Sequence, residues 1–518
     1  MIIFLPVITM LLTALLLLGL RLTGSRFKYP WILAAGGSTL SLISVFLWQI
    51  HSPQSISLPS WQLVTAFLYV PAWLADGISW PYALALAALA AAVIWTSVVR
   101  DENDPISWAG TLTLTGFGIL AVASENPLTL LLAWSGIDIF ELVTMLRSTE
   151  DEAQTQAAVI AFSVRLAGTG MVLWADLVGV STGVPLDFRA VPAGAGIILL
   201  IAAGLRLGVL PMHLPYRKDN VVRRGFGTAL RLVSAASSLA LLSRIPASAL
   251  ESALTPFLLI LTAVAALYAG WMWLRSSDEI LGRPFWILGF ASLSIAESLR
   301  GNPTGSTGWG VALILCGAVL FLFSARRRSI TWLPVLALWP LSTLPFSLTA
   351  AGWQSGNTLS WIYIIPFLPA HALFVAGFIR HTLHPGETSL ESQEKWVKII
   401  YPTGLLIPLA VAVLLGFWGW AGAGTLGLWW LAIIVILLDA GCFYLATRFL
   451  VRLPPGNTSS QWTQIFRLER FYSFLNVVYG LFRRIADVVI GFLEGDGGLL
   501  WSFLLLVLIL SIFSTRGR

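Results

Sequence analysis

Long apolar runs recur along the whole chain, and they limit it to a fold that lies in a membrane. Hydrophobic residues make up 57% of the 518 residues, and charged residues make up only 11%. A run of about 17 to 25 apolar residues can cross a bilayer as a helix, which satisfies its own backbone groups there. The sequence therefore predicts an all-α polytopic membrane protein with about sixteen transmembrane helices. We place these spans at about 2–20, 31–50, 78–99, 107–123, 127–146, 157–180, 192–210, 226–243, 253–274, 284–299, 307–324, 331–351, 359–380, 398–420, 425–448 and 498–514.

Most connections between the expected spans are short, but two are long. Residues 51–76 are rich in Pro, Ser and aromatic side chains, which favours an outer loop with short strands. Residues 452–497 place apolar side chains at helical spacing with arginines between them. We therefore expect an amphipathic surface helix at about 460–490, before the last span. The first run has no basic segment and no cleavage site, so we expect it to stay in the protein as a span.

The distribution of Lys and Arg predicts the orientation of the chain. Most of these residues fall in loops that would lie on one side of the membrane if sixteen spans alternate. Cytoplasmic loops carry the excess of positive charge, so we expect the N-terminus outside a prokaryotic inner (plasma) membrane. This topology accounts for the net charge of +6. It leaves the lipid bilayer as the expected partner and gives no reason to expect nucleic-acid binding.

No sequence motif predicts a catalytic site or a cofactor. Cys316 and Cys442 both lie in apolar spans, where free buried thiols are expected. His381 and His384 lie near a helix end, where a solvated pair is commoner than a metal site. The sequence has no Gly-rich phosphate loop, no cysteine cluster for iron–sulfur and no motif for NADH, flavin or quinone. We expect no metal, no cofactor and no catalytic residue of its own, although membership of an enzyme complex stays open.

Two arginines stand inside apolar runs. Arg206 lies in AGAGIILLIAAGLRLGVLP, and Arg231 lies in GTALRLVSAASSLALL. An ionisable residue at membrane depth is costly, so it usually lines a buried polar path or has a charged partner. Both arginines are therefore candidates for an ion pathway.

Four stretches resemble, in their order, the antiporter-like membrane subunits of respiratory complex I, membrane-bound hydrogenases and Mrp cation/proton antiporters. In GILAVASENPLTLLLAWSGIDIFELVTML, Glu125, Asn126 and Trp134 match the acidic-Asn turn and the helix that follows it in that family. The other three stretches are ADGISWPYALALAALAAAVI, LRLGVLPMHLP and EGDGGLLWSFLLLVLIL. The resemblance covers about 75–245 well and the rest only through topology, so the chain is similar to a divergent member of the family.

The resemblance implies two inverted five-helix repeats, each with a broken helix. A broken helix is tolerated at membrane depth only where it lines a hydrated cavity. The breaks would fall at Pro211 and in LSTLPFSLTAAGW, where Pro345 and Gly352 suit such a role. The implied parts are the N-terminal spans with the outer loop (1–106), the first repeat (107–248), the second repeat (249–384) and the C-terminal spans with the surface helix (385–518).

The chain departs from the residues that the resembled family uses to move protons. Ser135 stands in place of the family's glutamate after Trp, and Arg206 stands in place of its seventh-span lysine. Arg231 falls at the eighth-span His or Lys position, and Trp353 falls near the twelfth-span lysine. The histidine of the break motif is present as His213. Arginine has a very high pKa, stays protonated at physiological pH and cannot pass on a proton, so the family's mechanism does not carry over directly.

Nearby carboxylates could replace the missing glutamate. Ser135, Asp138 and Glu141 are spaced three residues apart, and we expect them to share one helix face. Asp138 or Glu141 would then take the place of the glutamate and pair with Arg206. The alternative is that these residues form static salt bridges that only hold the bundle together.

The remaining charged residues within the spans are secondary candidates or structural groups. Arg165 and Asp439 are the secondary candidates, and Asp439 has no evident partner in the sequence. Asp176 and Glu297 lie near helix ends, where charged side chains often only reach toward water. We expect these two carboxylates to be structural.

The residues and the resemblance together predict a divergent antiporter-type membrane subunit. It would act with other membrane subunits in an assembly like NADH:quinone oxidoreductase, a hydrogenase or Mrp, and take part in moving protons or monovalent cations. An alternative is a non-conducting structural or docking subunit of the same fold. An independent secondary transporter is disfavoured, because the sequence has no polar cluster specific for another solute.

Overall fold

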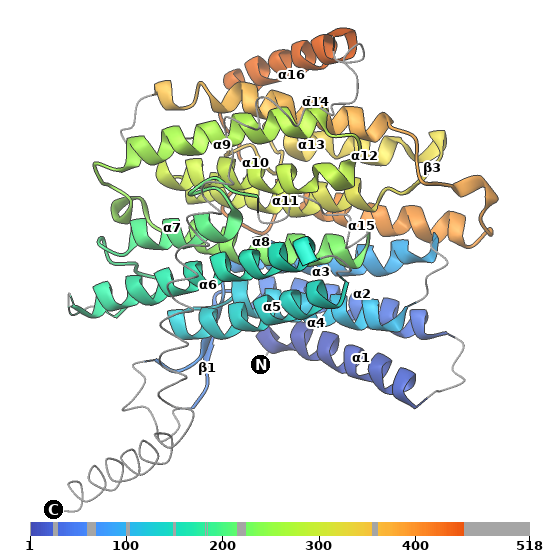
Figure 1. Cartoon of the computed structure of the whole chain (residues 1–518), viewed down its shortest axis with the longest axis horizontal. Helices are drawn as coiled ribbons and strands as arrows, with labels where there is room; N and C mark the ends of the chain where they lie inside the picture. The colour runs from blue at the N-terminus through green and yellow to red at the C-terminus, as the bar shows by residue number, and fades with distance from the viewer. Residues whose placement is uncertain are drawn as a thin grey trace, which may run out of the picture. The chain divides into compact units, whose positions relative to one another are not determined.

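Helices form most of the chain, and they run side by side (Figure 1). The computed structural model describes residues 2–23, 29–59, 69–99, 104–148, 152–181, 183, 185–214, 224–354 and 361–449. Each of the first fifteen expected spans overlaps an α-helix in these ranges. The last expected span at 498–514 and the surface helix expected at 460–490 lie outside the described residues.

The elements follow one another in an order dominated by long helices. The α-helices are α1 (Leu5–Leu22), α2 (Pro30–His51), α3 (Ser79–Thr96), α4 (Pro105–Val122), α5 (Pro127–Ser148), α6 (Glu152–Ser181), α7 (Gly196–Leu207), α8 (Phe226–Arg244), α9 (Thr255–Arg275), α10 (Glu279–Leu299), α11 (Pro303–Leu322), α12 (Trp332–Leu336), α13 (Leu338–Leu341), α14 (Phe367–Leu383), α15 (Val397–Phe417) and α16 (Trp429–Phe449). The 3-10 helices are η1 (Ile2–Phe4), η2 (Ser97–Val99), η4 (Ala247–Ala249), η5 (Arg328–Ile330), η6 (Trp361–Tyr363) and η7 (Leu390–Ser392).

Eleven helices in the described part of the chain are long and apolar enough to cross a membrane. The chain is therefore a multi-pass membrane protein. The side on which the N-terminus lies stays a prediction from the distribution of Lys and Arg.

Side chains that accept hydrogen bonds begin three of the helices. The Asp104 carboxylate accepts from the Ile106 amide at the start of α4, and the Asp278 carboxylate accepts from the Leu281 amide at the start of α10. The Asn302 side-chain oxygen accepts from the Gly305 amide at the start of α11. The first amides of a helix have no partner within it, so these caps stabilise the helix ends.

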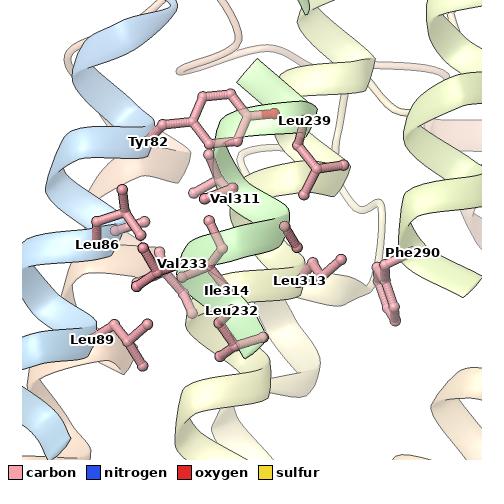
Figure 2. Packing of buried hydrophobic residues seen from close by; sticks show 14 of the residues in the cluster. Tyr82, Leu86, Leu89, Leu232, Val233, Leu239, Phe290, Val311, Leu313 and Ile314 are labelled. Carbon is pink, nitrogen blue, oxygen red and sulfur yellow. The ribbon is translucent and has the colours of Figure 1, made fainter. Parts of the chain in front are cut away.

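The centre of the bundle consists of α3, α8, α10 and α11. Figure 2 shows Leu86 of α3, Val233 of α8, Phe290 of α10 and Ile314 of α11 among the buried side chains that pack there. The most apolar stretch of α11 is entirely buried inside the protein, whereas only 22% of the most apolar stretch of α16 is buried. The helices at the periphery thus present apolar side chains outward, as a lipid environment requires.

Two helices are broken, and both breaks lie where the sequence predicts them. Helix α7 ends at Leu207, and the chain turns through Gly208, which has a φ of 78°. The second break follows α13, where Thr343 and Phe346 have φ values of 56° and 63°. Helix α7 is thus shorter than the span expected at 192–210, and the span expected at 331–351 is interrupted after α13, within the stretch where a break was expected.

Each break follows the fourth helical segment in one of two successive sets of five. The first follows α7, which is the fourth helix from α4 to α8. The second follows the α12–α13 pair, which is the fourth helical segment from α9 to α14. This order matches the two five-helix repeats of the expected fold, while the boundaries proposed at residues 106, 248 and 384 stay predictions.

Short strands connect the helices at two points. Strands β1 (Gln54–Ser57) and β2 (Ala72–Ala75) pair antiparallel, with Gln54 opposite Ala75, so the strands expected in the outer loop are confirmed. Strands β3 (Ala325–Arg326) and β4 (Thr388–Ser389) pair in parallel.

Asp76 connects the outer loop to the core. Its carboxylate accepts from the amides of Ile78 and Ser79 at the start of α3, and it pairs with Arg244 at 2.9 Å. Burial alone would raise the pKa of the Asp76 carboxyl, but Arg244 and the Ser79 amide hold this pKa below its usual value. The ion pair therefore joins the start of α3 to the end of α8.

The second break requires a close approach of α15, which gives a test by substitution. A Cβ atom at Gly416 would lie 2.2 Å from the Phe346 carbonyl oxygen, whereas a Cβ at Gly170 of α6 would meet nothing within 4 Å. We expect Gly416→Ala to lower the thermal unfolding temperature in detergent, because backbone atoms must shift, at a cost of about 1–3 kcal/mol. Gly170→Ala is the matched control, and we expect no loss there because Ala favours a helix over Gly. Equal effects of the two substitutions would contradict the close approach.

Candidate functional site

The end of α7 carries an arginine that is paired with a carboxylate of α5. Arg206 donates two hydrogen bonds to Asp138, at 2.7 Å and 2.8 Å, from its two terminal nitrogens. The guanidinium also lies 4.0 Å from the centre of the Trp134 ring. Both charged side chains are buried. This two-point geometry is the strongest that an arginine and a carboxylate form.

A second carboxylate on α5 joins two further arginines. Glu141 accepts hydrogen bonds from both terminal nitrogens of Arg165 on α6, and from Arg231 on α8 at 2.5 Å. Asp138 lies 3.7 Å from Arg165, so the two carboxylates belong to one ion-pair cluster. We call Asp138, Glu141, Arg165, Arg206 and Arg231 the arginine cluster. It connects α5, α6, α7 and α8 inside the bundle.

One face of α5 builds this cluster. Trp134, Asp138 and Glu141 are buried, and their spacing of four and then three residues places them on the same side of a helix. Ser135 is exposed on the surface of the protein. The expectation that Ser135 shares the face of Asp138 and Glu141 is therefore wrong, because Ser135 is rotated away from the line that runs through Trp134.

A small cavity lies beside the arginine cluster. Its volume is about 40 Å³, and a water molecule needs about 10–15 Å³ of such space. Its polar lining consists of Arg165, Arg206, His213, Arg231 and Ser234. His213 follows the first break, with its Nδ1 atom 2.8 Å from the Pro211 carbonyl oxygen. The cavity thus brings the predicted site residues Arg206, Arg231, His213 and Arg165 together around a space large enough for water.

The chemistry of the arginine cluster is that of fixed charge. Guanidinium groups do not lose their protons in proteins, so neither Arg206 nor Arg231 can relay a proton. The cluster can hold four helices together and set the local electric field. This arrangement fits the alternative of static salt bridges as well as the pairing of Arg206 with Asp138.

The second break is held by a different set of polar groups. Arg300 donates to Glu297 at 2.5 Å, and Asn302 donates to the other oxygen of Glu297 at 2.7 Å. Arg300 also donates to the Trp353 carbonyl, and Asn302 donates to the Ala351 carbonyl. Glu297 was expected to reach toward water, but it is buried and fixes the turn that follows the second break. Asp176 is partly exposed and accepts a hydrogen bond from Tyr69 at 2.5 Å.

A buried histidine lies against the second break. The Nε2 atom of His371 on α14 is 2.9 Å from the carbonyl oxygen of Leu341, the last residue of α13. The Nδ1 atom of the same ring is 3.3 Å from Asp439 Oδ1 on α16. Asp439 therefore has a partner, which the sequence did not reveal because about seventy residues separate the two side chains in the chain.

The signal that could have found His371 is its setting in the sequence. It lies within the apolar segment FLPAHALFVAGF, as Arg206 and Arg231 lie within theirs. An ionisable residue inside a span is a site candidate by default. Attention to metal-ligand spacing among the histidines left this residue out.

Comparison with known proteins identifies the fold. No protein-family model matches the sequence, and no curated protein sequence matches it. The structure is similar to a chain of the Mrp complex from Dietzia sp. DQ12-45-1b, with a TM-score of 0.70 and 14% identity over 100% of this chain and 63% of that chain.

Two respiratory complexes contain similar chains. The membrane-bound sulfane sulfur reductase, an archaeal respiratory membrane complex, gives a TM-score of 0.64 and 12% identity over 99% of this chain and 100% of that chain. A chain of respiratory complex I from Thermus thermophilus gives a TM-score of 0.58 and 17% identity over 79% of this chain and 97% of that chain. The chain thus has the antiporter-like fold, as its sequence predicts, and its low identities mark it as a divergent example. It spans about two thirds of the length of the matched Mrp chain, 63%.

The buried pair of Arg206 and Asp138 predicts a large loss of stability when only one partner is removed. We expect Arg206→Ala to destabilise the protein by about 3–5 kcal/mol, because Asp138 stays buried without its main partner. Replacing both side chains, as in Arg206→Met with Asp138→Leu, removes both charges and recovers most of the loss. Thermal unfolding in detergent measures each variant.

An exposed ion pair provides the control for this test. Arg189 is 2.7 Å from Glu125, and 45% of its side chain is exposed. We expect Arg189→Ala to cost less than about 1 kcal/mol. If Arg206→Ala were as mild as Arg189→Ala, the arginine cluster would not stabilise the bundle.

Proposed function

We propose that this chain is a membrane subunit of a multi-subunit complex of the Mrp or complex I type, and that it takes part in moving protons through the membrane. The fold supports this proposal, because all three similar chains belong to such complexes. The observation that carries it is the buried contact of His371 with both Leu341 at the second break and Asp439 on α16. Histidine and aspartate can exchange protons, whereas the arginines of the first repeat cannot.

The two repeats would then differ in their chemistry. Beside the first break, Arg206 and Arg231 supply permanent positive charge. Beside the second break, His371 supplies an imidazole in contact with Asp439, and an imidazole, unlike a guanidinium, can exchange a proton. Proton transfer would use the second repeat, and the first repeat would hold a fixed field and a rigid frame.

A non-conducting structural subunit of the same fold is the second candidate. The arginine cluster favours it, because three arginines, which cannot relay a proton, pair with two carboxylates and connect four helices. A structural subunit would have the same partner subunits as a proton-moving subunit, but it would carry no proton flux.

Reconstitution of the full chain into liposomes distinguishes these candidates. We expect a pH-sensitive dye to report proton flux above that of protein-free liposomes for the wild type, and flux at the protein-free level for His371→Gln. The control is Arg189→Ala, which changes an exposed ion pair and is expected to keep the wild-type flux. Repeating the assay with and without sodium tests whether a monovalent cation moves as well.

Co-purification tests the other part of the proposal. A tagged chain extracted from its native membrane in mild detergent is expected to bring other membrane subunits with it in fixed stoichiometry. Partners without flux would support the structural subunit. A chain that purifies alone would contradict the multi-subunit assembly.

A further inference from the structure

The partners of His371 restrict where protons can lie. One ring nitrogen faces the Leu341 carbonyl oxygen at 2.9 Å, and the other faces Asp439 Oδ1 at 3.3 Å. A carbonyl oxygen and a carboxylate oxygen both accept hydrogen bonds, and neither donates one. A neutral imidazole has one N–H, so it can donate to only one of these two oxygens.

Burial makes it unfavourable for His371 Nδ1 and Asp439 Oδ1 to face each other without a proton on either atom. His371 is fully buried, and Asp439 is 8% exposed. Among the described residues, the Nδ1 atom of His371 and the Oδ1 atom of Asp439 have no hydrogen-bond partner. If His371 donated to Leu341 and Asp439 were ionised, a nitrogen lone pair would face a carboxylate with nothing between them. An uncompensated buried charge of this kind is strongly unfavourable.

From this geometry we propose that His371 and Asp439 form a binding site for one exchangeable proton. The proton lies either on Nδ1, which gives an imidazolium beside a carboxylate, or on the carboxyl group, which gives a neutral imidazole beside a carboxylic acid. Nδ1 and Oδ1 lie 3.3 Å apart without an aligned hydrogen bond, so transfer requires a rotation of one of the two side chains, after which the N–H bond breaks and the O–H bond forms. The proton comes from water and returns to water. Both forms have no net charge, which suits a site inside a membrane.

The surroundings isolate this pair from other charges. The rings of Trp309 and Trp353 lie 5.4 Å and 5.9 Å from the His371 ring. On the neighbouring α10, the Glu297 carboxylate accepts hydrogen bonds from Arg300 and Asn302. At the far end of α14, His381 lies against the Trp273 carbonyl oxygen. The proton is therefore shared between His371 and Asp439 alone among these described groups.

The site couples a proton to the broken helix. The Nε2–H of His371 donates to the last residue of α13, and a hydrogen bond from a charged donor is roughly twice as strong as one from a neutral donor. When the proton moves from Nδ1 to Asp439, the imidazole becomes neutral, and its hydrogen bond to the Leu341 carbonyl oxygen becomes weaker. This inference deepens the proposed function and rests on it for the transport role, but the bound proton can be measured without any flux.

Nuclear magnetic resonance of the full chain in lipid nanodiscs tests the inference directly. The chain has only five histidines, so selective ¹⁵N-histidine labelling gives few signals, and His371→Gln assigns the one of interest. Labelling of aspartate with ¹³C and comparison with Asp439→Asn assign the carboxyl carbon. At neutral pH we expect one extra proton on the pair, seen as two protonated ring nitrogens or as a protonated Asp439 carboxyl.

Substitutions of Asp439 distinguish a shared proton from a buried histidine alone. With Asp439→Asn we expect a neutral His371 that keeps its proton on Nε2, and with Asp439→Glu we expect the extra proton to return. Asp176→Asn on α6 is the control, because this carboxylate bonds to Tyr69 and not to His371. A neutral His371 beside an ionised Asp439 in the wild type would overturn the inference. A bound proton in a chain that carries no flux would leave the site intact and refute only the transport role.

Discussion

The absence of water in a bilayer is the constraint on which this structure depends. Every backbone group freed by a broken helix and every buried charge must find a partner inside the protein. Around the second break, Asn302 and Arg300 donate to carbonyls at 351 and 353, and His371 lies against the carbonyl of Leu341. These polar groups at the second break thus serve as partners for the carbonyls there.

The two breaks are supported by groups of different chemistry. Near the first, guanidinium groups, which keep their charge, surround two carboxylates. Near the second, an imidazole contacts a carboxylate, and a proton held by this pair can lie on either partner without changing the net charge of the pair. In our proposal, the part around the first break is a rigid frame and the part around the second break holds the titratable site.

The sequence predicts the fold well because the strongest signals are local. Apolar run length identifies the spans, and the glycine and proline near 208–211 and 345 mark the breaks. The helix face of α5 is a harder case. The spacing predicted that Asp138 or Glu141 pairs with Arg206, and the structure has Asp138 as the partner. The same spacing also placed Ser135 on that face, but the structure has Ser135 exposed.

Contacts between distant helices could not be read in this way. Asp439 had no partner in the sequence because His371 belongs to another helix, and only packing brings α14 and α16 together. Glu297 was placed near a helix end by counting, yet the turn at 351–354 folds over it and removes it from water. Local patterns determine which residues are candidates, and tertiary packing determines their partners.

The central claim is that the titratable site lies in the second repeat and that the first repeat acts as a frame. Proton flux through the double variant Arg206→Met with Asp138→Leu tests it most directly, since this variant removes the bidentate ion pair of the first repeat and is expected to retain most of the stability. Our account predicts that flux persists in this variant and still requires His371. Loss of flux in a stable double variant, together with continued flux in His371→Gln, would contradict it.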